Sequence, residues 1–207
     1  MTHYLRPAGR HRYEPAPIKG SRFIATVAPV VDEGAARRIL EELRAEFDDA
    51  RHVCFAWRLG PNGEPSRSSD DGEPGGSAGR PILAQLEGHG VSDAIAVVVR
   101  YFGGVKLGVG GLMRAYGGAA GQCLDRATLE QVRPMQWLRI EHPYDCSGAV
   151  SGLLAAGGLE TQDAVYGEVV SFLVVLPEED VEAFLGDLSD RTAGRASSSV
   201  ESGPGGA

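Results

Sequence analysis

Two glycine-rich segments flank one apolar run, and this arrangement constrains the fold more than any other feature of the chain. The acidic segment spans residues 70–81, the basic segment spans residues 101–111, and the apolar run is Ala94–Val99. An uninterrupted apolar run of this length indicates a strand covered on both faces, so we expect a central strand of a sheet. Glycine adopts backbone conformations that other residues avoid, at an entropic cost. We therefore expect the two segments to converge over the end of this strand and to form a shaped pocket.

Charge is divided unevenly along the 207 residues. Residues 1–133 hold 17 Lys and Arg against 16 Asp and Glu, a balance of +1, whereas residues 134–207 hold 3 against 12, a balance of −9. A polyanion is therefore expected to meet the first part, because the second part repels it.

The sequence shows no signal peptide and no apolar run long enough to span a membrane, so we expect a cytoplasmic protein without a membrane partner. Its three cysteines are widely spaced, which predicts neither a disulfide-linked partner nor a zinc site.

Composition and periodicity predict four parts. Residues 1–17 are rich in Pro and Arg and are expected to form a mobile basic arm. Residues 18–133 form a first domain, residues 134–203 a second, and residues 204–207 a frayed tail. The sequence pattern of the second domain predicts the order strand, helix, strand, strand, helix, strand. This is the order of the ferredoxin-like split βαβ arrangement.

The first domain alternates strand and helix patterns around one long loop. Asp32 is placed to cap a helix, because the apolar residues after it recur at helical spacing. Residues 60–79 show no periodicity, which is typical of a functional or disordered loop. The remaining expected elements are strands at 23–30, 53–59 and 94–99, a short helix from Pro81, and a helix over 112–124.

The acidic segment places Asp70, Asp71 and Glu73 within four residues. Carboxylate oxygens are the ligands that Mg²⁺ and Ca²⁺ prefer, but the spacing is not that of a calcium-binding loop. The alternative is that these acids cap backbone N–H groups in turns and pair with a base such as Arg80 or Arg100. The second interpretation is favoured, so we predict no metal and no cofactor.

The basic segment resembles an anion cradle, because free N–H groups at a helix N-terminus favour phosphate. Lys106 and Arg114 add positive charge there. The phosphate-loop pattern is absent, since Lys106 precedes Gly108, and the dinucleotide pattern fails at Met113. Tight packing of helix on strand is therefore favoured over a nucleotide site.

Two further pairs of residues have a chemical and a structural interpretation. His52 and Cys54 lie on one face of a predicted strand, where they could act as base and nucleophile. A core thiol beside a hydrogen-bonded histidine is the favoured interpretation. Tyr101 and Phe102 could stack on a nucleic-acid base, although aromatic pairs at strand ends more often pack.

Five segments carry a resemblance to the IMPACT/YigZ family. They are Lys19–Phe23, His52–Trp57, Asp70–Gly79, Arg100–Gly104 and the stretch from Leu107 to Tyr116. The resemblance implies an α+β protein with two domains. It implies that the first has the fold of ribosomal protein S5 domain 2. The second resembles the last domain of elongation factor G. Eukaryotic members of the family restrain a starvation-responsive kinase pathway by competing for its activator.

These observations predict a non-enzymatic binding protein that regulates translation or a stress response through the ribosome, RNA or a translation-associated protein. The alternative is a metal-assisted enzyme acting on a phosphorylated small molecule or nucleotide, and a third possibility is a protein–protein adaptor. No set of nucleophile, base and orienting group is visible, so we predict no catalytic residue. The predicted binding residues are His52, Asp70, Asp71, Glu73, Gly75, Gly79, Arg80, Arg100, Tyr101, Phe102, Gly103, Gly104, Lys106, Gly108, Arg114 and Tyr116.

Overall fold

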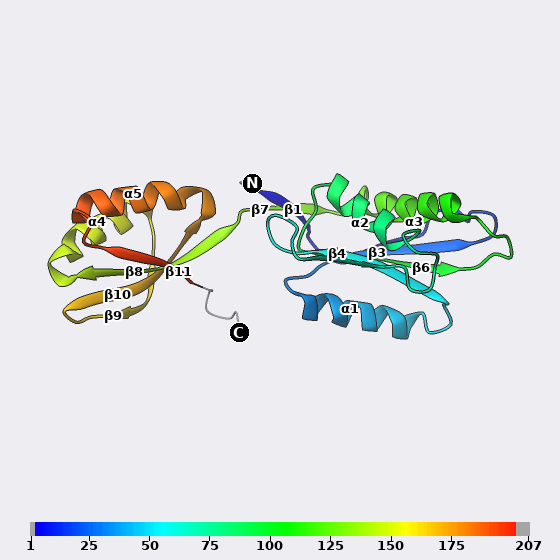
Figure 1. Ribbon diagram of the computed structural model, residues 1–207, viewed down its shortest axis with the longest axis horizontal. Helices are drawn as coiled ribbons and strands as arrows, with labels where there is room; N and C mark the ends of the chain where they lie inside the picture. The colour runs from blue at the N-terminus through cyan, green and yellow to red at the C-terminus, as the bar shows by residue number, and fades with distance from the viewer. Residues whose placement is uncertain (1–2, 202–207) are drawn as a thin grey trace. The chain divides into compact units, whose positions relative to one another are not determined.

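A computed structural model describes residues 3–201, which divide into two units after Val132 (Figure 1). The division lies next to Pro134, at which the sequence analysis places the domain boundary. Both units combine helices with β-sheets, which confirms the predicted α+β class with two domains. The predicted tail at 204–207 lies outside the described residues, as do residues 202 and 203.

The first unit is built on a five-stranded antiparallel sheet in the order β2-β3-β6-β4-β5. Its strands are β2 (His11–Tyr13), β3 (Arg22–Pro29), β6 (Ala94–Tyr101), β4 (His52–Arg58) and β5 (Ser66–Ser69). The apolar run forms β6, which is the central strand and is buried from Ala94 to Arg100, as predicted. Such a strand reads as a continuous apolar run because both of its faces pack against other elements.

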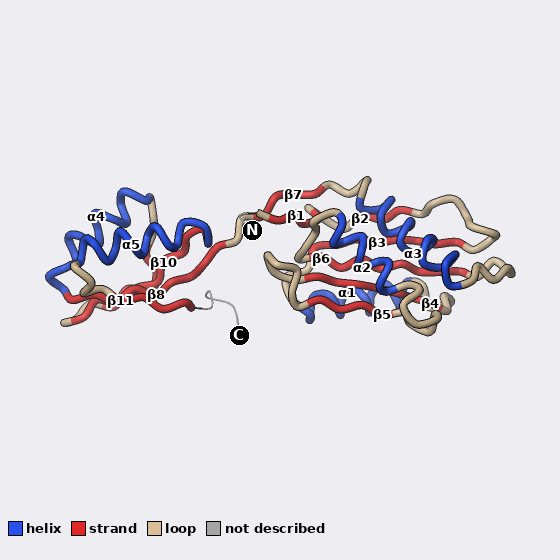
Figure 2. The backbone as a smooth tube through the Cα atoms, turned by 45° about the horizontal axis from the view of Figure 1, so that its top comes forward, coloured by secondary structure: helices blue, strands red, loops and turns tan. Residues whose placement is uncertain are grey.

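Helices cover both faces of this sheet. Helix α1 (Glu33–Glu46) lies on one face, and helices α2 (Gly79–Gly88) and α3 (Val109–Leu124) lie side by side on the other (Figure 1, Figure 2). Side chains alternate along β4, so Phe55 and Trp57 pack toward α1 whereas Cys54 packs toward α2 and α3. Asp32 caps α1 as predicted, because its Oδ1 accepts a hydrogen bond of 2.6 Å from the Ala35 N–H.

Two parts of the first unit differ from the sequence expectation. In place of a mobile arm, the chain forms β1 (Tyr4–Pro7), which pairs with β7 (Leu129–Val132), and β2, which pairs with β3. The arginines of these strands bind distant acids, as in the 2.5 Å ion pair between Arg6 and Glu130. The expected loop at 60–79 contains β5, a polar edge strand without a hydrophobic period.

The second unit is a four-stranded antiparallel sheet in the order β11-β8-β10-β9, covered by two helices. This is the predicted ferredoxin-like order. Buried Ile140 and Phe172 lie in its core. Its elements are β8 (Met135–Pro143), α4 (Ser147–Gly157), β9 (Thr161–Val165), β10 (Val169–Pro177), α5 (Val181–Thr192) and β11 (Ser197–Glu201), with short 3₁₀ turns at Tyr144–Cys146 and Glu178–Asp180.

Within residues 3–201, no helix has both the length and the apolar character that crossing a membrane requires. Cys54, Cys123 and Cys146 are each buried, and each is a free thiol.

Candidate functional site

A buried ion pair joins the acidic segment to the end of β6. Arg100 donates a hydrogen bond of 2.6 Å from Nη1 to Oε1 of Glu73, and the two side chains are only 6% and 4% exposed. Tyr116, from α3, donates a hydrogen bond of 2.7 Å to the same oxygen. The Arg100 guanidinium also lies over the rings of Phe23 and Phe102, at 5.7 and 5.5 Å. Three segments that are far apart in the sequence therefore meet at one carboxylate.

Asp70 occupies the N-terminus of α2. Its Oδ2 accepts a hydrogen bond of 2.7 Å from the Gly76 N–H, and its Oδ1 accepts from the N–H groups of Ala78 and Gly79 at 2.8 and 2.9 Å. Burial raises the pKa of Asp70, but these three N–H groups and the charge of Arg80 outweigh it and hold the pKa below its usual value. The backbone N–H groups at the N-terminus of α2, which could otherwise bind an external anion, are thus occupied by the protein's own carboxylate.

Asp71 is also engaged by its own chain. Its Oδ2 accepts a hydrogen bond of 2.7 Å from the Val53 N–H, and its Oδ1 accepts one of 2.9 Å from Arg44. The three acids therefore accept hydrogen bonds from backbone N–H groups or pair with arginines, as the favoured interpretation of the sequence predicts. Arg100 is the base that pairs with Glu73. Among the residues that the structure describes, no three His, Cys, Asp or Glu side chains gather closely enough to hold a metal ion.

Cys54 and His52 contact the backbone of the acidic segment. The Cys54 thiol donates to the Asp70 carbonyl oxygen at 3.0 Å, and His52 Nδ1 lies 2.9 Å from the Asp71 carbonyl oxygen. Burial raises the pKa of the Cys54 thiol to about 12. A thiol with this pKa stays protonated near neutral pH, so the geometry favours a core thiol over an activated nucleophile.

Close backbone packing explains several glycines of the two segments. A Cβ on Gly103 would lie 1.9 Å from the carbonyl carbon of Gly20, and a Cβ on Gly79 would lie 2.7 Å from the backbone nitrogen of Ser69. The buried Ser21 hydroxyl accepts a hydrogen bond of 3.1 Å from the Gly103 N–H. Gly104 and Gly108, by contrast, have open space around them and left-handed φ values of 91° and 72°.

A groove runs between the N-terminal halves of α2 and α3, and we call it the α2–α3 groove. Its volume is about 760 Å³, and its lining includes Gly75, Arg80 and Arg114 among the predicted binding residues. Neither Arg80 nor Arg114 forms an ion pair with another residue in the range 3–201. Exposed Val109 and Met113 add apolar surface. The groove thus combines free positive charge with apolar contact area.

Several residues of this lining were not among the predicted binding residues. They are Gly76, Pro81, Ala84, Gln85, Val109, Met113, Gly117 and Gly118. A signal was available, because Val109, Met113 and Gly117 recur at every fourth position and therefore share one face of α3.

Other predicted residues lie outside the groove lining. Lys106 is exposed in the segment before α3. The Tyr101 hydroxyl donates a hydrogen bond of 2.6 Å to Asp49, and Phe102 is 53% exposed beside Arg100.

The chain matches two domain families. Residues 19–124 match the Impact N-terminal domain, and residues 140–195 match a domain of unknown function, DUF1949. The first match covers the sheet of the first unit from β3 to α3, including both glycine-rich segments. The second match lies entirely within the second unit.

Relatives extend the match over most of the chain. The IMPACT family member YigZ of Escherichia coli (strain K12) is 40% identical over 179 residues, which make up 86% of this chain and 88% of that protein. A Thermus thermophilus protein, "IMPACT family member in pol 5′ region", is 42% identical over 86% of this chain and 97% of its own length. The crystal structure of a hypothetical protein superposes with a TM-score of 0.71 and 37% identity over 99% of this chain and 100% of that chain. This chain therefore belongs to the IMPACT family.

Proposed function

We propose that this IMPACT family member is a non-enzymatic binding protein that regulates translation or a stress response through the ribosome, RNA or a translation-associated protein. The α2–α3 groove carries the proposal. Arg80 and Arg114 line it and neither forms an ion pair with a described residue, and half-exposed Val109 and Met113 lie beside them. Free guanidinium groups bind phosphate or carboxylate oxygens, and apolar side chains supply contact area.

The hydrogen bonds and ion pairs already formed by the acidic residues favour a binding protein over an enzyme. A catalytic carboxylate needs an oxygen that is free to accept a proton or to hold a metal ion. Glu73 is buried against Arg100 and Tyr116, and Asp70 is bound by three backbone N–H groups. These carboxylates therefore shape the surface on which Arg80 and Arg114 are presented.

The segment that precedes α3 in the sequence has the same mixed character. Phe102 and Val105 are about half exposed, at 53% and 49%, and Lys106 follows them in the segment before α3. Large exposed apolar side chains rimmed by polar groups are typical of interaction sites. The composition suits RNA phosphates and also an acidic segment of a ribosomal or ribosome-bound protein, so the experiment must distinguish the two.

Co-sedimentation with ribosomes tests the proposal. We expect the protein to sediment with ribosomes at about 50 mM salt and less at about 200 mM salt, because phosphate contacts are salt-dependent. The Arg80→Ala/Arg114→Ala variant should lower the affinity about tenfold, which corresponds to about 1.4 kcal/mol of binding free energy. Binding to protein-free ribosomal RNA would identify RNA as the partner, and binding to intact ribosomes alone would identify a ribosomal or ribosome-bound protein.

Arg38→Ala/Arg51→Ala is the matched control. These arginines are exposed, lie outside the groove and form no ion pair within the part of the chain that the structure describes. The control removes the same charge, so it separates a general electrostatic effect from a local one. Absence of co-sedimentation at both salt concentrations contradicts the proposal. Mg²⁺-dependent phosphoester hydrolysis that is lost in a Glu73→Gln variant shown by circular dichroism to be folded would favour the enzyme instead.

A further inference from the structure

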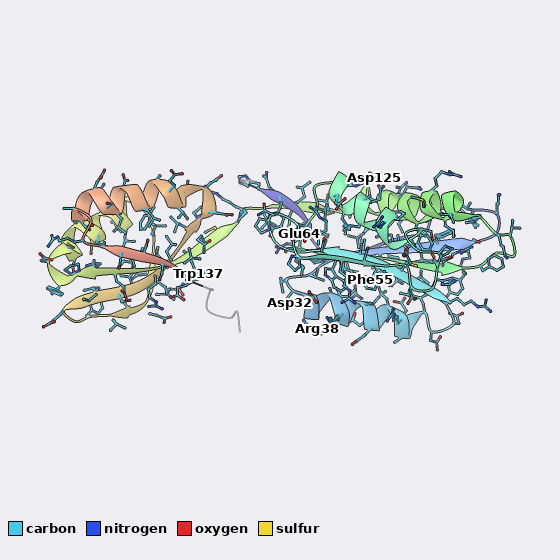
Figure 3. All side chains as sticks on the ribbon, viewed as in Figure 1. Asp32, Arg38, Phe55, Glu64, Asp125 and Trp137 are labelled. Atoms are coloured by element: carbon cyan, nitrogen blue, oxygen red, sulfur yellow. The ribbon has the colours of Figure 1, made fainter. Side chains whose placement is uncertain are left out.

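A pocket opens on the helix-covered side of the second unit's sheet, between α4 and the strands β8 and β10, and we call it the α4 pocket. Its volume is about 550 Å³, which lies within the range typical of small-molecule sites. Figure 3 marks Trp137 near the beginning of β8, and the pocket lies toward the other end of this strand, at His142. Every residue of its lining belongs to the second unit, so the pocket is independent of the α2–α3 groove. We propose that the α4 pocket binds an aliphatic amine in its protonated form.

His142 occupies a position of β8 at which the strand pattern predicts an apolar side chain. Side chains alternate along a strand, so Leu138, Ile140 and His142 share the face that packs against the helices. Leu138 and Ile140 lie in the hydrophobic core, and His142 is only 3% exposed. Buried polar groups normally have hydrogen-bond partners, so each ring nitrogen of a histidine at this position needs one.

One ring nitrogen of His142 is paired within the protein, and the other is not. Nδ1 lies 2.8 Å from the carbonyl oxygen of Pro143, and a carbonyl oxygen only accepts, so Nδ1 carries a proton. In the neutral ring Nε2 therefore holds a lone pair. Nε2 forms no hydrogen bond within residues 3–201 and retains accessible surface, unlike the fully buried hydroxyl oxygen of Ser147 in the same lining. A ligand in the pocket can thus reach Nε2 and donate a hydrogen bond to it.

Apolar side chains form the wall of the pocket beside this nitrogen. Val150, Leu154, Val170 and Phe172 are buried and line it. The Phe172 ring meets the His142 ring edge to face, with centroids 6.0 Å apart and planes at 67°, which orients the imidazole. These side chains offer contact area to a hydrocarbon chain but no charge. The ligand is therefore expected to carry an apolar chain beside its polar group.

The charge of the lining selects a cation. Glu160 lines the pocket, is exposed and forms no ion pair with a described residue. The described residues of the lining include no Lys or Arg, and a carboxylate attracts a cation and repels an anion. The hydroxyl groups of Ser151 and Thr161 add acceptors, and an ammonium has three N–H donors. The pocket thus suits a protonated amine better than an alcohol or a carboxylate.

Nuclear magnetic resonance of the His142 ring nitrogens tests the proposal on the full chain, at about pH 8, where an aliphatic amine is protonated. In the free protein we expect the Nδ1–H tautomer. The His142→Phe variant, which keeps a planar ring beside Phe172, assigns the signal by removing it. Titration with hexylamine should shift the Nε2 signal until the shift saturates in the millimolar range.

Two compounds of the same length separate charge from apolar contact. Hexanol can donate to Nε2 but is neutral, so it should bind at least about threefold more weakly than hexylamine. Hexanoate should bind more weakly still, because Glu160 repels it. Absence of a saturable shift with hexylamine, an Nε2–H tautomer in the free protein, or binding of hexanol or hexanoate as tight as that of hexylamine overturns the proposal.

Two variants localise the binding. Glu160→Gln should weaken the binding of hexylamine about threefold and leave that of hexanol unchanged, because it removes only the charge. Glu182→Gln removes the same charge from α5 outside the pocket lining and should leave both affinities unchanged. Both glutamates are exposed, so both variants are expected to fold, and circular dichroism checks this. Equal affinity of Glu160→Gln and the parent protein for hexylamine would place the amine elsewhere and overturn the proposal.

Discussion

Glu73 is held inside the first unit by two donors, because one buried oxygen accepts from both Arg100 and Tyr116. Glu73→Gln would leave the Arg100 charge buried without a counter-ion. Arg100 Nε already lacks a hydrogen-bond partner among the described residues, so no second acceptor compensates. We expect the free energy of unfolding to fall by about 3 kcal/mol or more, as for other buried pairs broken at one partner. Urea denaturation measures this change.

The control for Glu73→Gln is Glu33→Gln, which breaks the exposed ion pair with Arg37 on α1. Exposed pairs of this kind contribute about 0–1 kcal/mol, because water screens them. If the two variants lose the same stability, the buried pair has no special role in the fold.

The Cys54 thiol predicts a dependence of stability on alkaline pH. Burial raises its pKa from 9.0 to about 12 in the folded protein. Above pH 9 the unfolded chain therefore loses this proton while the folded chain keeps it. The free energy of unfolding should fall as pH rises, by at most about 1.4 kcal/mol per pH unit from this group. Urea denaturation at pH 8, 9 and 10 should show the decline, and Cys54→Ala should make it shallower. An identical slope in both proteins would contradict the assignment.

At the scale of elements, α2 begins and ends in glycine, and the two glycines differ in the space that a side chain would have. A Cβ on Gly79 would meet the backbone of Ser69 at 2.7 Å, whereas a Cβ on Gly88 would meet nothing within 4 Å. Gly79→Ala should destabilise the first unit by about 1–3 kcal/mol, as expected for overpacking against backbone. Gly88→Ala should be neutral or stabilising by up to about 1 kcal/mol, because alanine favours helix. Thermal unfolding compares them, and a loss of stability in Gly88→Ala equal to that in Gly79→Ala would exclude the clash.

Elements with a hydrophobic period could be predicted from the sequence, and elements without one could not. The apolar run of β6 and the stripe of α1 after Asp32 both follow the expected patterns. Strands β1, β2, β5 and β7 escaped prediction, because β2 and β5 lie at sheet edges, and β1 and β7 form a two-stranded sheet that is tied to the rest of the unit by a bridge between Leu5 and Val91. Their positions depend on backbone pairing and on ion pairs with residues distant in sequence, which a local pattern does not encode.

For the candidate site too, local sequence patterns predicted some residues and could not predict those that tertiary packing adds. Local motifs predicted that the acids would cap turns, and Asp70 does so at α2. The motifs also identified Arg80 and Arg114, the two arginines in the α2–α3 groove lining. They could not identify Pro81 and Gln85, which enter that lining because α2 packs beside α3. Tertiary packing, and not local pattern, decides which faces of two helices form a groove.

At the scale of the whole molecule, each unit has a core of its own. The first has clusters on both faces of its sheet, and the second has a cluster around Ile140 and Phe172. A compact unit with its own core can fold by itself. The strand β7, which ends at Val132, pairs with β1, so a truncated chain must retain it.

Residues 1–132 alone should therefore fold cooperatively and should bind ribosomes at least as tightly as the full chain. The proposed groove lies wholly in this unit, and the removed residues 133–207 hold 4 Lys and Arg against 12 Asp and Glu, a balance of −8, which opposes binding to a polyanion. Circular dichroism during heating measures folding, and co-sedimentation measures binding. The Arg80→Ala/Arg114→Ala substitutions should weaken binding by the same factor in both lengths of chain, because the groove is the same. A folded residue 1–132 unit that no longer binds would show that the second unit supplies essential contacts, and the groove alone could then not account for the function.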